Sequence, residues 1–290
     1  MIDLYQDVTN RIVTAIEAGT PPWVKPWSVS DFRPRNAKTQ RAYRGVNSVL
    51  LSLEADSKGY ADSRWLTFRQ ATELGARVRG GEHGTTVVFY KLTELPEQSA
   101  DRTAIQYPTV PLLRSFKVFN VAQIDGLPES MTKPPEPAAW DAHTEAEALL
   151  YASGAEIHHG GDQAYYQRAK DIVHLPPRSS FAAAGDYYAT ALHELVHWTG
   201  HETRCNRNLT GRFGDDAYAV EELVAELGSA MLCAHCRIDG QLQHPAYLRA
   251  WLQVLKADKR AIFTASAKAQ AGADFVLRTQ QPAQAEEVAA

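Results

Sequence analysis

Residues 187–200 read YYATALHELVHWTG, and this stretch decides the fold of the second half of the chain. It contains His193, Glu194 and His197 in the H-E-x-x-H pattern of metal-binding helices. Helical positions four residues apart lie about 40° apart around the axis, so both imidazoles project from one face and can hold one cation. Glu194 points about 100° away from His193, which suits a general base beside a metal better than a ligand on it. The stretch therefore predicts a helix over Asp186–Thr199 with a metal centre.

The third metal ligand is expected on the next predicted helix, which spans Ala217–Cys236. A catalytic zinc needs three protein ligands and one open position. Glu222 and Glu226 are four residues apart and share one face of that helix. We expect Glu222 to be the ligand and Glu226 to orient a ligand histidine, as in gluzincins, with the reverse assignment as the alternative. Two nitrogens and one oxygen favour Zn²⁺, and Mn²⁺ or another divalent metal also suits such a site.

The composition is that of a folded globular protein, and its charge is uneven. Hydrophobic residues make up 44% and charged residues 22% of the 290 residues, with a formal net charge of −4. Residues 1–128 carry a net charge of +3, and the remainder carries −7. The sequence has no apolar run of the ~18–20 residues that a membrane helix needs, and it begins without a signal-peptide block. Three cysteines are too few for a disulfide framework, so we expect a cytoplasmic protein with no membrane partner.

The chain is expected to form two α+β domains. A proline-rich linker over residues 128–140 should join a first domain (1–127) to a helix-rich second domain (141–278), with a flexible tail over 279–290. We expect this linker to let the second domain reach separate protein partners. Periodicity predicts helices over 2–19, 46–55, 67–74, 144–153, 186–199, 217–236 and 245–271, and strands over 85–91, 113–120, 157–159 and 171–175. The strand at 172–175 precedes the metal helix, and we expect it to be an edge strand that pairs with an extended substrate, with a core strand as the alternative.

Several long motifs resemble those of one protein family. In the second half they are HELVHWTGH from His193, R-x-N-R at Arg204–Arg207 and YAVEELVAELGSAML from Tyr218. In the first half they are PPWVKPW (21–27), YRGVNSVLL (43–51), WLTFRQATELGARVRGGEHGTTVVFYK (65–91) and FKVFNVAQIDGLP (116–128). Together these motifs resemble the ArdC-type plasmid antirestriction proteins over roughly residues 1–275.

The resemblance implies a function for each half. In that family, the N-terminal domain binds single-stranded DNA and the C-terminal domain has a zincin-like fold with a divalent metal. The resemblance also implies that the protein protects incoming conjugative plasmid DNA from host restriction.

The residues of the first half fit contact with single-stranded DNA. Single-strand binders combine a basic groove for phosphates with aromatic rings on which bases stack. Basic, polar and aromatic residues interleave here, and the candidate DNA contacts are Arg33, Arg35, Lys38, Arg41, Tyr43, Arg44, Asn47, Trp65, Arg69 and Gln70. A protein that mimics DNA needs a dense negative charge. The net positive charge of this half therefore excludes that function.

Two functions use the same residues. One is an antirestriction protein whose main activity is DNA binding, with a metal domain attached. The alternative is an active zinc metallopeptidase, recruited by DNA binding, that cleaves a restriction-modification subunit or another host protein. In this alternative Glu194 is the catalytic base.

Overall fold

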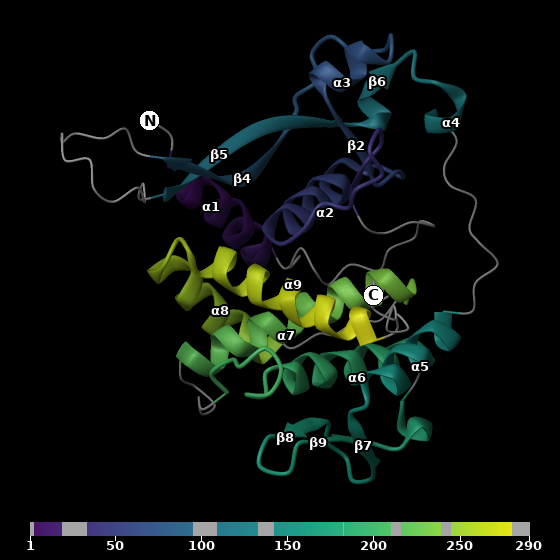
Figure 1. Cartoon of the computed structure of the whole chain (residues 1–290), viewed down its shortest axis with the longest axis vertical. Coiled ribbons are helices and arrows are strands. Elements are labelled where there is room, and N and C mark those ends of the chain that lie inside the picture. Colours follow the sequence, from purple (N-terminus) through teal and green to yellow (C-terminus); the bar gives the residue numbers. More distant parts are fainter. Residues whose placement is uncertain are drawn as a thin grey trace, which may run out of the picture.

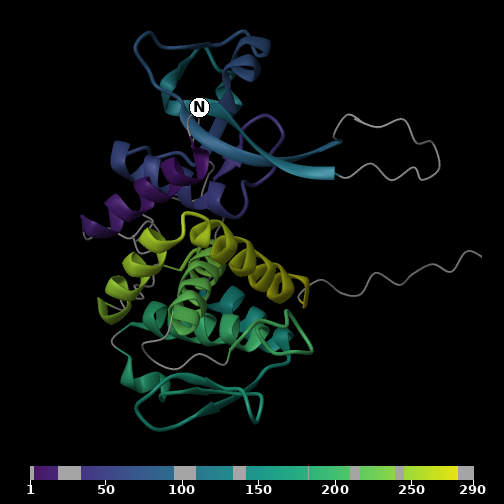
Figure 2. The same cartoon turned by 90° about the vertical axis from the view of Figure 1, so that its left-hand side faces the viewer.

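The computed structural model describes residues 3–18, 34–94, 109–132, 142–181, 183–209, 216–238 and 245–279. Within these ranges helices and strands are mixed, which confirms the α+β fold class. Figures 1 and 2 show helices packed between a sheet of the first half and a smaller sheet of the second half. In these ranges no helix is long and apolar enough to span a membrane.

The first half is built on a four-stranded sheet in the order β1-β2-β5-β4. Only β1 and β2 run parallel, and a separate pair is formed by β3 and β6. The elements are α1 (Leu4–Glu17), β1 (Arg35–Asn36), α2 (Val46–Lys58), β2 (Arg64–Thr67), α3 (Phe68–Glu73), β3 (Arg77–Val78), β4 (Thr85–Glu94), β5 (Thr109–Asn120), η1 (Val121–Gln123), β6 (Ile124–Asp125) and α4 (Glu129–Thr132). The predicted helices and strands of this half are therefore present, and β4 and β5 are longer than predicted.

The second half is a helical bundle with a three-stranded sheet in the order β7-β9-β8. Its elements are α5 (Ala142–Ser153), β7 (Glu156–His159), β8 (Tyr165–Gln167), β9 (Ile172–Leu175), η2 (Arg178–Ser180), α6 (Ala184–Thr199), α7 (Asp216–Cys236), α8 (Pro245–Ala257) and α9 (Ala261–Thr279). The prediction of one helix over 245–271 is wrong, because the chain turns between α8 and α9. There the side chain of Asp258 accepts a hydrogen bond from the Arg260 backbone N–H at 2.8 Å, and this local bond competes with a continuous helix.

The two halves share one hydrophobic core. Val8 and Ile12 of α1 belong to the same buried cluster as Leu192 of α6 and Leu223 of α7. The spacing of its apolar residues gives helix α1 this stripe. Asp3 stabilises the helix by capping its N-terminus, where its carboxylate accepts hydrogen bonds from two backbone N–H groups of the first turn. Burial of such a stripe is the main contribution to the stability of a helix of this length.

Polar contacts also join the halves. The Thr9 hydroxyl donates to the Lys259 carbonyl at 2.8 Å, and the Gly45 N–H donates to Gln270 Oε1 at 3.1 Å. Figure 2 shows α1 and α2 lying against α8 and α9. This packed interface restricts how far the second half could move on the linker to reach separate protein partners. Within the expected linker, residues 129–132 form α4, and residues 133–140 lie outside the described residues.

Candidate functional site

Helices α6 and α7 pack closely enough to bring their polar side chains together. Helix α6 is buried along most of its length, as its apolar flanks predict. Gly228 of α7 lies against it, and a Cβ at this position would lie 2.8 Å from Val196 Cγ1. The absence of a side chain therefore lets the two backbones approach.

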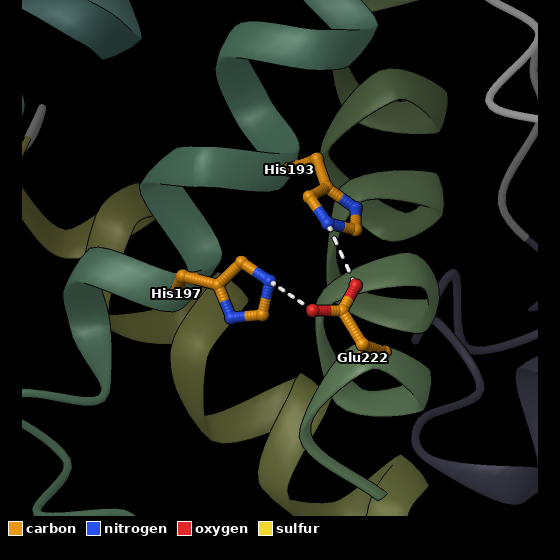
Figure 3. Close-up of side chains that lie close together, drawn as sticks. All are labelled: His193, His197 and Glu222. Atoms are coloured by element: carbon orange, nitrogen blue, oxygen red, sulfur yellow. Dashed lines mark ion pairs between the residues drawn. The ribbon is translucent and has the colours of Figure 1, made fainter. Parts of the chain in front are cut away.

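His193, His197 and Glu222 meet between these two helices (Figure 3). The Nε2 atoms of His193 and His197 each lie 3.5 Å from an oxygen of Glu222, one imidazole at each carboxylate oxygen. One ligand atom from each residue lies within 4.8 Å of the other two. All three side chains are almost fully shielded from solvent. A converging set of two imidazole nitrogens and one carboxylate oxygen fits a divalent metal ion.

The charges of these three side chains are coupled. Burial alone would raise the pKa of Glu222, but hydrogen bonds from His193 and His197 hold it well below its usual range. Burial alone would lower the pKa of His197, but its bonds to Glu221 and Glu222 raise it to about 10. The carboxylates therefore stabilise positive charge at this place, whether on an imidazole or on a metal ion.

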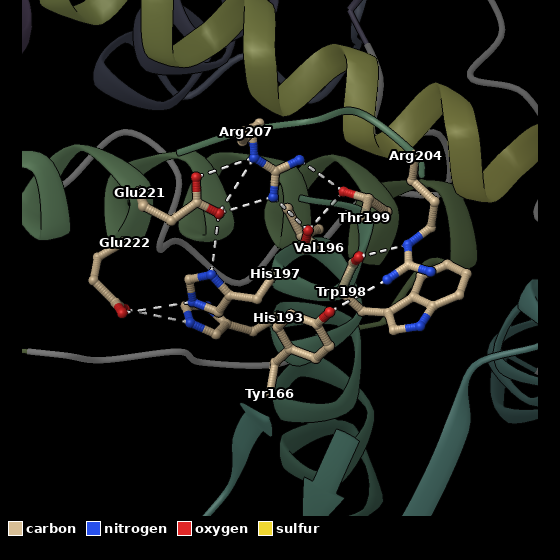
Figure 4. Close-up of polar contacts among 10 residues, drawn as sticks. All are labelled: Tyr166, His193, Val196, His197, Trp198, Thr199, Arg204, Arg207, Glu221 and Glu222. Carbon is tan, nitrogen blue, oxygen red and sulfur yellow. Dashed lines mark hydrogen bonds and ion pairs between the residues drawn. The ribbon is translucent and has the colours of Figure 1, made fainter. Parts of the chain in front are cut away.

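A buried Arg207–Glu221 pair supports His197 from the side opposite Glu222 (Figure 4). Glu221 Oε1 lies 3.2 Å from His197 Nδ1, and the Arg207 guanidinium donates to both oxygens of Glu221, at 2.8 and 3.0 Å. Arg207 also donates to the Thr199 hydroxyl at 2.8 Å and to the Val196 carbonyl at 2.6 Å. The arginine thereby binds the last turn of α6 and fixes the carboxylate that orients a histidine.

Sequence reasoning missed Glu221 as an orienting residue. Two features of the sequence could have indicated it. Glu221 adjoins Glu222 in an apolar helix, where a buried carboxylate needs a partner. The R-x-N-R motif supplies such a partner, Arg207. Glu226 lies one turn further along α7 and is 2% exposed. The converging group comprises Glu222 and not Glu226, and an orienting role for Glu226 stays a prediction.

Glu194 opens onto the same site. It lines a pocket of about 250 Å³ together with His193, His197 and Glu222. A tyrosine hydroxyl could donate to a developing oxyanion in such a site. Tyr218 lines this pocket. The Tyr187 hydroxyl instead pairs with His159 at 2.9 Å, and the Tyr188 hydroxyl donates to Glu147 at 2.8 Å. The pocket therefore combines His193, His197 and Glu222 with two further carboxylates, Glu194 and Glu221, and with the tyrosines Tyr165, Tyr166 and Tyr218.

The strand expected at the edge of the sheet lies at its centre instead. β9 pairs with β7 on one side and β8 on the other, so it has no free edge for a peptide. The sheet ends at β8, and Tyr165 and Tyr166 of that strand line the pocket. Arg204 holds this wall in place, because it donates to the Tyr166 hydroxyl, pairs with Asp171 and stacks 3.8 Å over the Trp198 ring.

Three cationic candidates for DNA contact, Lys38, Arg44 and Arg69, lie at the surface and form ion pairs. Lys38 pairs with Glu73 at 2.7 Å, and Arg69 pairs with the same carboxylate at 2.8 Å. Arg44 pairs with Asp274 yet keeps 63% of its side chain exposed. Surface ion pairs of this kind are weak, so these cations can still contact phosphate.

Two other basic candidates, Arg35 and Arg41, lie on or beside strand β1. Arg41 is exposed, whereas Arg35 on β1 is partly buried. Arg33 lies outside the described residues.

Three of the uncharged candidates are held inside the fold. The Asn47 side chain donates to the Val88 carbonyl at 2.6 Å and accepts from the Val88 N–H at 2.8 Å. The Gln70 side chain accepts from the Thr67 N–H at 3.0 Å as part of a capping box. Trp65 is completely buried, so it cannot stack on a base, and this part of the prediction is wrong. Tyr43 is half-buried against the same small core, and burial raises its pKa.

Replacing Trp65 with alanine should lower the free energy of unfolding by about 3–5 kcal/mol, because the deletion leaves a cavity in a packed core. The affinity of the folded protein for DNA should not change. Urea unfolding and an oligonucleotide titration measure the two effects. Phe68→Ala is the control, because Phe68 is 61% exposed and its loss should change stability by about 0.5 kcal/mol or less. Lost DNA binding with unchanged stability in Trp65→Ala would contradict this assignment.

Two family models match the chain. One, described as the N-terminal domain of anti-restriction factor ArdC, matches residues 2–119. The other, described as a zincin-like metallopeptidase, matches residues 144–268.

Two curated proteins are similar over almost the whole chain. A DNA primase TraC of Escherichia coli is 40% identical over 295 residues, which cover 96% of this chain but only 27% of the primase. The chain thus spans about a quarter of the length of that relative. The uncharacterized protein y4eC of Sinorhizobium fredii (strain NBRC 101917 / NGR234) is 41% identical over 296 residues, covering 99% of this chain and 95% of y4eC.

Solved structures of the ArdC antirestriction protein from plasmid R388 have the same fold. The metal-free form is 43% identical with a TM-score of 0.83, covering 96% of this chain and 98% of that one. The Mn(II)-bound form is 43% identical with a TM-score of 0.81, covering 98% of this chain and all of that one. With both halves and nearly the full length matched, this chain belongs to the family of ArdC antirestriction proteins.

Proposed function

We propose that this protein protects incoming conjugative plasmid DNA from host restriction by binding it as a single strand, and that it carries a divalent metal in its second half. The observation that carries the proposal is the likeness to the R388 antirestriction protein, at 43% identity over 98% of that chain. The exposed cations of the first half support contact with phosphates. The three free cysteines, two of them buried, support a reducing compartment, and we infer the cytoplasm.

We infer that His193, His197 and Glu222 hold the metal ion. Their donor atoms lie within 4.8 Å of one another, a spacing that one ion can bridge with small side-chain movements. Two imidazoles and one carboxylate favour zinc, and the Mn(II)-bound relative supports manganese as a second candidate. Metal analysis of protein purified without added metal, followed by competition between the two ions, would distinguish them.

A second candidate function is that of a zinc metallopeptidase acting on a restriction-modification subunit or another host protein. The observation that favours it is the carboxylate of Glu194 in the pocket of the metal-ligand set. A bound divalent ion would supply acidity to a water molecule. Glu194 would take the proton of that water. Tyr218 lines the same pocket, and its hydroxyl would be the candidate donor to a developing oxyanion. The edge of β8 would offer backbone groups to an extended peptide.

Replacing Glu194 with glutamine separates these two functions. The substitution removes the base but keeps the shape of the side chain and the three metal-ligand residues. We expect metal content, single-stranded DNA affinity and plasmid protection to be unchanged, because binding is the main activity in the proposal. A conjugation assay into a restricting host measures protection, with the protein's metal content measured in parallel. Loss of protection with intact metal and DNA binding would favour the peptidase instead.

A further inference from the structure

The strand pair β4–β5 has two different faces in its outer half. In the antiparallel register, Phe89 lies opposite Arg114, and Val87 lies opposite Phe116. These side chains project from one face, because side chains alternate between the faces of a strand. The neighbouring pair, Val88 and Ser115, projects from the other face.

From Phe89 outward along the strand pair, other described parts of the protein pack against only one of these two faces. On one side, Val88 and Leu113 pack in the large core that also contains Val8 of α1. On the other side, Phe89 is 41% exposed and Phe116 is 39% exposed. In Figure 2 the two strands extend beyond the helices. Two phenylalanine rings thus remain at the surface of a well-paired sheet.

The two exposed rings form a compact pair beside a cation. Their centroids lie 5.6 Å apart with an interplanar angle of 59°. Arg114 is exposed directly across from Phe89, and it has no ion-pair partner among the described residues. An apolar pair beside such a guanidinium is typical of a surface that binds an anionic aromatic ligand.

A further exposed cation, Arg44, precedes the helix that contacts strand β4 beside Phe89. Asn47 of α2 bonds both backbone groups of Val88, so α2 begins beside the residue that precedes Phe89. Arg44 lies three residues before Asn47 in the chain, with 63% of its side chain exposed. Arg44 is therefore close in the chain to the Asn47–Val88 contact, which adjoins Phe89.

We propose that Phe89 and Phe116 are the base-stacking surface for single-stranded DNA, with Arg114 and Arg44 contacting the phosphates beside them. This inference rests on the proposed function, that the first half binds single-stranded DNA, and it adds where the bases bind. Two rings on a sheet can stack successive bases without reading their sequence, because every base has a π face. The buried Trp65 cannot take this role.

The test compares two pairs of variants in the full-length protein. Binding of a fluorescein-labelled oligo(dT) of about 30 nucleotides, long enough for several binding sites, is followed by fluorescence anisotropy at fixed salt. Loss of a stacked ring weakens binding by about 5- to 150-fold, so Phe89→Ala/Phe116→Ala should weaken it at least about tenfold. Phe68→Ala on α3, an exposed phenylalanine elsewhere, should bind like wild type. Arg114→Gln should weaken binding and lower its salt dependence, whereas Arg77→Gln on β3 should not.

The outcomes distinguish the proposed function, binding of single-stranded DNA, from the inference about where the bases stack. A wild-type protein that does not bind oligo(dT) removes the proposed function itself. Wild-type binding that the Phe89/Phe116 double variant retains, or that Phe68→Ala loses to the same extent, overturns this inference alone. A wild-type dimer that dissociates in the double variant with unchanged DNA affinity also overturns it, because a second copy then covers the rings. Should the alanine double variant fail to fold, Phe89→Leu/Phe116→Leu keeps the apolar volume without the π faces and must still weaken binding.

Discussion

Protein in which His193 and His197 are both replaced by alanine should hold no divalent ion after dialysis, whereas the wild type should hold about one per chain. The two imidazoles supply two of the three converging donor atoms, and Glu222 alone is a weak ligand. Metal analysis measures occupancy directly. Thermal unfolding gives a second readout, because an ion that binds only the folded state stabilises it by about 2.7 kcal/mol at 100 times its Kd. Added metal should therefore raise the Tm of the wild type and leave that of the double variant unchanged.

His201→Ala is the matched control for this experiment. His201 follows α6, four residues after His197, and its ring bonds to Thr203 rather than to the converging group. This variant should keep full occupancy. Replacing Glu222 and Glu226 separately with glutamine identifies the third ligand, because loss of the ligand should lower metal affinity more than loss of an orienting residue. Full occupancy in the His193/His197 double variant would refute the proposed metal centre.

Replacing Arg207 with methionine should lower the free energy of unfolding by about 3–5 kcal/mol. The substitution leaves the Glu221 carboxylate, only 10% exposed, without its bidentate partner, so a buried charge loses most of its compensation. The Val196 carbonyl and the Thr199 hydroxyl lose a donor at the same time. Urea unfolding of the metal-free protein measures this loss without any contribution from metal binding.

Arg204 offers a control from the same motif. Its partner Asp171 is 38% exposed and can regain water when the arginine is removed, so Arg204→Met should cost less stability than Arg207→Met. Glu221→Gln should also lower the free energy of unfolding, because the buried Arg207 loses its counter-charge. In the folded variant it should weaken metal binding by about 10- to 100-fold, because it removes the carboxylate that orients His197. Equal losses of stability in the two arginine variants would show that the Arg207–Glu221 pair has no special structural role.

The sequence by itself determined most of the helices and the two histidines that we propose as metal ligands. The H-E-x-x-H spacing places two imidazoles on one face of any helix, so no tertiary contact is needed to predict them. The apolar periodicity of α1 and α7 and the alternation in β4 and β5 are local properties as well. Helical spacing along α7 also identifies Glu222 as a candidate ligand, with Glu226 as the alternative.

Other features depended on contacts between residues far apart in the chain. Trp65 and Phe89 are both aromatic residues of strands, and only the packing of α2 and the sheet decides that one is buried and the other exposed. Strand order has the same character. The sequence predicted β9 as an edge strand. In the structure, β8, which precedes it in the chain, pairs along its other side.

For the proposed metal site, too, some features follow from the local sequence and others from tertiary packing. Spacing along one helix predicts which side chains share a face, but the register between α6 and α7 decides which carboxylate reaches which imidazole. Gly228 packs against Val196 where the two helices approach. The register places Glu222 between the two histidines and Glu221 behind His197, where Arg207 returns from the following loop to bind it. The ligand types were local information, because they follow from helical geometry, whereas their orientation was decided by tertiary packing, because it depends on atoms that meet only when the chain is folded.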